Sequence, residues 1–141
     1  MLGMIQKRQR GAILPLAAIA ILAILGMAAL ALDMSHAHLE KTRLQNSLDA
    51  AALSAAKVLD QTGNTQLAET AGRDTFADNA AAPGNEALGS SLLGGALTLT
   101  VEFSSTLNPF VPATEPAYYV RIKAQGHAVT NWFAPLFGVD E

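Results

Sequence analysis

The chain has 141 residues and a formal net charge of −3; half of its residues are hydrophobic, but only 6% are aromatic. It contains no cysteine, which excludes disulfide bonds, thiolate catalysis and cysteine-based metal sites. Twelve acidic and only six basic residues follow position 32, and an acidic part without a basic patch argues against nucleic acid as a partner.

One long helix is predicted at the N-terminal end. Residues 11–32 (GAILPLAAIAILAILGMAALAL) are 22 residues without a charge, and a helix of that length spans roughly 33 Å, enough to cross a bilayer. Residues 33–60 are abruptly polar but contain neither proline nor glycine, so we expect the helix to continue to Asp60. Half of this helix would lie in lipid and half outside.

The outer half of the helix carries an apolar stripe at helical spacing, which predicts burial along one side. Its members are Leu44, Leu48, Ala51, Ala52, Ala55, Val58 and Leu59.

Residues 1–10 form a short basic head containing Lys7, Arg8 and Arg10, which the positive-inside rule keeps in the cytoplasm. This predicts a single-pass protein of the bacterial inner membrane with its C-terminal part outside. A removable signal peptide is the alternative, because residues 29–31 (ALA) have the form of a cleavage site. The length of the apolar run and the helical pattern that continues through this site favour a retained anchor.

Small residues in the apolar run would let helices approach closely in lipid. They are Gly11, Ala17, Ala20, Ala23, Gly26 and Ala29. Three-residue spacing makes these residues spiral around the helix, so a generic alanine-rich span is the alternative reading. Pro15 lies in the first turn, where its missing N–H does little harm. Asp33 closes the run, where an acid either stays hydrated or pairs with a neighbouring subunit.

Residues 61–141 are expected to form one small extracytoplasmic α+β domain. Gly63 marks a helix stop, and Asn64 or Thr65 can cap a second helix that ends near residues 81–84. The face of that helix is predicted from Leu67, Ala71, Phe76 and Ala80. Residues 85–95 are rich in glycine and serine and are predicted to be a flexible connector.

Two alternating segments predict an antiparallel pair of strands. The first is Leu97–Phe103, and the second is Tyr118–Ala124 with Tyr118, Val120, Ile122 and Ala124 facing inward. Between them, residues 104–116 carry three prolines and are predicted to be an exposed loop. Trp132, Phe133 and Phe137 form an aromatic stretch that caps the core or contacts a membrane surface or a partner.

No pattern of residues predicts catalysis, a metal site or a cofactor. His36 and His38 point to different sides of a helix, His127 is isolated, and phosphate-binding or nucleophile motifs do not occur in the sequence. We therefore expect a protein that is not an enzyme.

The segment Arg10–Ala56, and above all RLQNSLDAAAL at residues 43–53, resembles the N-terminal module of the TadE/TadG-like Flp pilus-assembly proteins. Asp33 also matches that family's pattern. The residues of the second half that carry the resemblance are Arg43, Leu44, Asn46, Leu48, Asp49, Ala51 and Ala52. These residues can also be explained by packing alone. In that interpretation Arg43 reaches Asn46 or Ser47 and stays in solvent at the edge of the packed face.

The resemblance implies a pilin-like outline and a pilus-assembly or minor-pilin-like component of a Flp/Tad adhesion and secretion apparatus. Its partners would be pilin-like subunits and the inner-membrane assembly platform, with self-association through the N-terminal helix. Leu16 stands where pilins cut by prepilin peptidase usually carry Glu, so we expect Met1–Arg10 to be retained.

Two other readings remain open. One is a membrane-tethered binding module that presents residues 104–116 and the aromatic tail without polymerising. The other is a truncated relative, because the von Willebrand A-like domain of longer TadG-like proteins does not follow.

Overall fold

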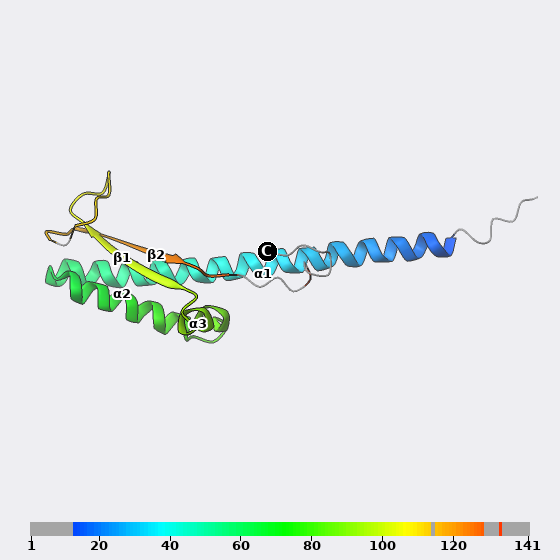
Figure 1. The fold of residues 1–141 in the computed structure, drawn as a ribbon, viewed down its shortest axis with the longest axis horizontal. Coiled ribbons are helices and arrows are strands. Elements are labelled where there is room, and N and C mark those ends of the chain that lie inside the picture. The colour runs from blue at the N-terminus through cyan, green and yellow to red at the C-terminus, as the bar shows by residue number, and fades with distance from the viewer. Residues whose placement is uncertain (1–12, 114, 129–132, 134–141) are drawn as a thin grey trace, which may run out of the picture. The chain divides into compact units, whose positions relative to one another are not determined.

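The computed structural model describes residues 13–113, 115–128 and 133. Its elements are α1 (Ile13–Thr62), α2 (Thr65–Ala80), α3 (Glu86–Leu93), β1 (Thr98–Ser104) and β2 (Tyr119–Gln125) (Figure 1). The predicted α+β class, with a long N-terminal helix and a small antiparallel sheet, is confirmed. The chain divides into two units, residues 1–36 with 131–141 and residues 37–130.

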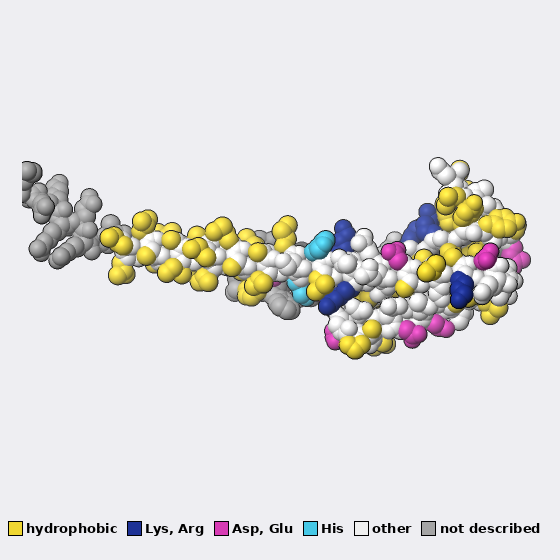
Figure 2. Space-filling model, turned by 180° about the vertical axis from the view of Figure 1, so that it is seen from behind, with side chains coloured by type: hydrophobic (Ala, Val, Ile, Leu, Met, Phe, Trp, Pro, Cys, Tyr) yellow, Lys and Arg dark blue, Asp and Glu magenta, His cyan; other side chains and the backbone are white. Residues whose placement is uncertain are grey.

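The first half of α1 is the apolar run. Within the described residues, α1 is the one helix long and apolar enough to cross a membrane, and its most apolar window is not buried inside the structure. Ile13, Leu22 and Leu25 are 74%, 69% and 60% exposed. Figure 2 shows hydrophobic side chains covering the visible face of this half. Because exposing so much apolar surface to water is costly, this half is suited to lipid or to another helix.

The second half of α1 packs along the predicted stripe, which is confirmed. Ala51 and Ala55 are completely buried and Leu59 is 5% exposed. The half-buried members of the stripe are Leu44, Leu48, Ala52 and Val58. The helix ends at Thr62, two residues later than expected, and Gly63 follows with a φ of +65°, a conformation that glycine adopts readily.

The helix α2 folds back along α1 and begins at the predicted cap. The Asn64 side chain accepts hydrogen bonds from the backbone N–H groups of Gln66 (2.9 Å) and Leu67 (3.1 Å). Its buried face consists of Ala68, Gly72, Phe76 and Ala80. The prediction of Leu67 on this face is wrong, since Leu67 is 53% exposed. Ala68 and Gly72 lie on this face instead, and a Cβ atom on Gly72 would lie 3.1 Å from the Cβ of Ala55, so α1 and α2 approach closely there.

The prediction of a flexible connector at residues 85–95 is also wrong, because α3 occupies Glu86–Leu93. Leu88 is 1% exposed and joins the cluster that contains Phe76 and Leu99. A Cβ atom on Gly89 would lie 2.8 Å from the carbonyl oxygen of Ala80, so this glycine lets α3 approach the end of α2. Tertiary packing thus outweighs the weak helix propensity of glycine and serine.

The strands β1 and β2 pair antiparallel with Leu99 opposite Ala124 and Phe103 opposite Val120. Their inner faces complete two buried clusters over α1 and α2. Val120, Ile122 and Ala124 are half-buried against these clusters as predicted. The prediction that Tyr118 faces inward is wrong, because Tyr118 precedes β2 and is 71% exposed.

Candidate functional site

The small residues of the apolar run lie on the surface of α1. Ala17, Ala20 and Ala23 are exposed, as is Pro15, whereas Gly26 is half-buried. Gly11 lies outside the described residues. Exposure of these side chains leaves the run accessible to lipid or to a neighbouring helix.

Asp33 is 7% exposed, which does not fit the first of its two sequence readings, a hydrated acid at the membrane boundary. The backbone N–H of Phe133 donates to both of its carboxylate oxygens, at 2.9 Å to Oδ2 and 3.2 Å to Oδ1. Of the aromatic candidates, Phe133 is half-buried, while Trp132 and Phe137 lie outside the described residues.

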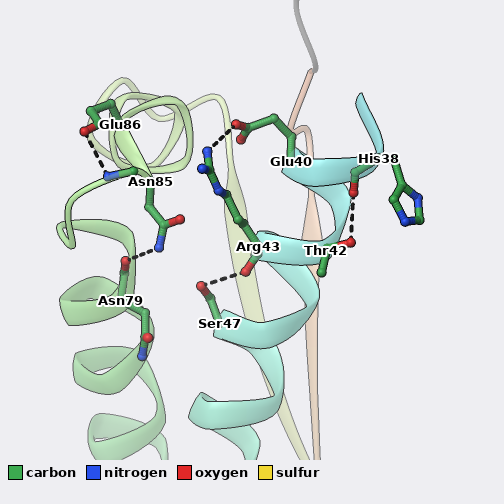
Figure 3. Close-up of polar contacts among 9 residues, drawn as sticks. His38, Glu40, Thr42, Arg43, Ser47, Asn79, Asn85 and Glu86 are labelled. Atoms are coloured by element: carbon green, nitrogen blue, oxygen red, sulfur yellow. Dashed lines mark hydrogen bonds and ion pairs between the residues drawn. The ribbon is translucent and has the colours of Figure 1, made fainter. Parts of the chain in front are cut away.

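Arg43 does not reach Asn46 as expected. Its guanidinium Nη1 lies 3.0 Å from Oε1 of Glu40, which is one turn earlier on α1 and only 4% exposed (Figure 3). Ser47 instead donates its hydroxyl to the Arg43 carbonyl at 2.9 Å. Sequence reasoning missed Glu40, although its position three residues before an arginine was a usable signal.

The Arg43 side chain also faces the turn between α2 and α3. A Cβ atom on Gly84 would lie 3.5 Å from Arg43 Nη2. Within this turn Asn85 donates its side-chain amide to the Asn79 carbonyl at 2.7 Å, and Glu86 accepts from the Gly84 N–H at 3.0 Å (Figure 3). The bond from the Gly84 N–H lowers the pKa of Glu86, and the charge of Arg43 adds to this effect. The Arg43 guanidinium therefore lies close to the α2–α3 turn.

The other motif residues divide between core and surface. Leu44 and Leu48 pack against the cluster around Phe76, Ala51 is buried within it, and Ala52 is half-buried. Asn46 and Asp49 are exposed. Most of the motif thus positions α2 and the sheet on α1, and its two exposed polar side chains are the ones available to a partner.

The predicted loop between the strands borders a groove of about 890 Å³. The N-terminal turn of α2 contributes Asn64 and Glu69, β1 contributes Val101 and Phe103, and the loop contributes Pro112. The remaining lining residues are Thr65, Gln66, Glu102, Ala113 and Glu115. Ala113 N–H donates to the Phe103 carbonyl at 2.8 Å, which fixes the loop against β1.

Clusters of three or more histidine, cysteine, aspartate or glutamate side chains suited to a metal ion are absent from the described part of the chain. His127 is held by Ser91, with 3.2 Å between Nδ1 and the hydroxyl oxygen. The described histidines are therefore not gathered with acids into a recognisable metal centre.

Residues 11–58 match the family model described as putative Flp pilus-assembly TadE/G-like, which is about a third of the chain. The matched residues coincide with nearly all of α1. Neither a curated protein nor a solved structure matches the chain. Over residues 11–58, which include Asp33 and the packing motif after it, this chain is similar to the putative Flp pilus-assembly TadE/G-like family.

Proposed function

We propose that the protein is a single-pass inner-membrane component of a Flp/Tad pilus system that acts as a minor-pilin-like subunit or in pilus assembly. In this proposal the first half of α1 lies in the membrane with the head in the cytoplasm, and residues 33–141 lie outside. Its partners are pilin-like subunits and the assembly platform.

One observation carries the proposal. The family match follows α1, and the first half of that helix exposes its large apolar side chains while the second half is packed into a folded unit. A helix of this form leaves lipid only by burying its apolar half against other helices, as it would in a filament or in an assembling complex.

The direct test is a helix exchange in a bacterium that carries the system. Deletion of the protein should reduce the amount of pilus sheared from the cells, and the wild-type chain should restore it. A chain in which residues 13–32 are replaced by an unrelated transmembrane helix keeps its anchor but loses the surface of α1. We expect this chain to insert normally and to fail to restore pili. If α1 served only as a tether, the exchanged chain would restore them.

The groove beside β1 supports a second candidate function, a tethered module that binds an envelope ligand without polymerising. Leu107 and Val111, which lie on the loop that borders the groove, are 65% and 55% exposed. Normal pilus formation by the helix-exchanged chain would favour this candidate.

A further inference from the structure

The edge of β1 that faces away from β2 is held at both of its ends. The carbonyl oxygen of Leu99 accepts from Nη1 of Arg73 on α2 at 3.0 Å. The carbonyl oxygen of Phe103 accepts from the N–H of Ala113 in the loop at 2.8 Å. Because neither donor belongs to β2, both carbonyls point to the free edge of the strand.

Val101 lies midway between these two contacts. In an antiparallel pair, alternate residues direct their N–H and C=O groups to the same edge, so Val101 faces the same way as Leu99 and Phe103. Within the described part of the chain, no hydrogen bond from outside the sheet reaches the N–H or the carbonyl of Val101. The edge is therefore open at Val101, inside a stretch of roughly 13 Å that is closed at both ends.

This open edge is one wall of the groove described above. Val101 and Phe103 line the groove opposite the first turns of α2, and Pro112 of the loop closes it. An extended peptide in the groove can exchange two backbone hydrogen bonds with Val101, as an added strand does at the edge of a sheet. The contacts at Leu99 and Phe103 limit the paired stretch to about three residues.

The charges around the groove favour a basic peptide. The charged residues that line it are all acidic: Glu69, Glu102 and Glu115. Glu69 and Glu102 already have basic partners within the chain. Glu115 is exposed and has no ion pair among the described residues, so its carboxylate is available to a ligand. A lysine or arginine beside it is attracted, and an acidic side chain is repelled.

We propose that the groove binds an extended segment of a partner protein that carries a lysine or arginine, and that this segment pairs with the backbone of Val101 as a short added strand. The proposal gives the second candidate function a class of ligand. It does not rest on pilus formation, because it needs only the folded unit that contains α2 and the sheet. Its test uses the purified chain, so failure of the helix exchange in cells leaves the result intact.

The test uses three short peptides with blocked ends, added to the full chain in detergent micelles. The probe is TKVKT, TEVET is its acidic counterpart, and a third peptide is TKVKT with an N-methyl group on the valine, which removes the backbone donor. Amide NMR signals and hydrogen exchange report on each residue separately. We expect TKVKT to shift the Val101 amide signal and to slow its exchange, TEVET to bind about tenfold more weakly, and the N-methyl peptide not to bind.

One exposed side chain of the protein tests the charge preference without disturbing the fold. Glu115→Gln should weaken binding of TKVKT about threefold, and Asp74→Asn, at an exposed acid of α2 outside the groove, should leave it unchanged. An unaltered Val101 amide at millimolar TKVKT would overturn the site. Equal binding of the N-methyl peptide would overturn strand pairing, and equal binding of TEVET or an unaffected Glu115→Gln protein would overturn the preference for a basic segment.

Discussion

Gly72 of α2 lies so close to Ala55 of α1 that a Cβ atom on Gly72 would be 3.1 Å from the Cβ of Ala55. The same atom would be 3.3 Å from the carbonyl oxygen of Ala51. The two helices therefore meet almost backbone to backbone, and the alanine run of the family segment has a structural reason: larger side chains at these positions would hold α2 away from α1.

Gly72→Val should destabilise the folded unit by about 1–3 kcal/mol, because the added methyl groups have no space between the helices. Thermal unfolding of the full chain in detergent, followed by circular dichroism, measures this. Ala77→Val, at an exposed position of the same helix, is the control and should cost only a few tenths of a kcal/mol. A Gly72→Val protein as stable as the control would show that the close approach is not required.

Arg43→Ala should lower the free energy of unfolding by about 1–3 kcal/mol, because the nearly buried Glu40 carboxylate loses its guanidinium partner. Combining Arg43→Ala with Glu40→Gln should cost less than the sum of the two single changes. Lys41→Ala, on the exposed side of the same turn, should change stability by less than about 0.5 kcal/mol. Additive costs would mean that the ion pair does not couple these residues.

Glu102 gives the sheet a predictable pH dependence. Its carboxylate lies 2.9 Å from Lys123 Nζ and 2.7 Å from Arg121 Nη2, and these hydrogen bonds lower the pKa of Glu102 below its ordinary value of 4.5. Because the folded pKa is the lower one, this contribution to stability is present at neutral pH and is lost as the pH falls below 4.5 through the folded pKa.

Glu102→Gln should therefore reduce the acid sensitivity of unfolding, and 0.5 M salt should have a similar effect because these partners are partly exposed. The measurement is the unfolding free energy between pH 7 and pH 3. Asp49→Asn, at an exposed acid without an ion pair in the described part of the chain, is the control. An unchanged acid profile in Glu102→Gln would contradict this assignment.

The features predicted correctly from the sequence were those that local pattern determines. The apolar run and the 3.6-residue stripe of α1 identify a helix and its buried side, and Gly63 with Asn64 identifies where one helix stops and the next begins. Alternation identified both strands, and the Arg43–Leu53 string indicated the family whose model matches residues 11–58.

The errors arose where distant residues decide the outcome. Leu88 makes α3 a packed helix, although Gly89, Ser90 and Ser91 favour a loop when considered alone. Of the four residues predicted on the buried face of α2, Phe76 and Ala80 are buried but Leu67 is exposed; Ala68 and Gly72 lie on this face instead, where α1 approaches closely. The contact between Asp33 and Phe133 spans a hundred positions, and no local signal indicates a backbone donor that far away.

The central proposal is that the first half of α1 packs against helices of other components of a Flp/Tad pilus system. The most direct measurement is to place a photo-crosslinking amino acid at the exposed Ala20, irradiate intact piliated cells, and identify the adducts in the inner membrane and in sheared pili by mass spectrometry. We predict adducts with a pilin-like subunit or a platform protein of the same system. Adducts with lipid alone in the inner membrane, and none in the sheared fraction, would contradict the claim.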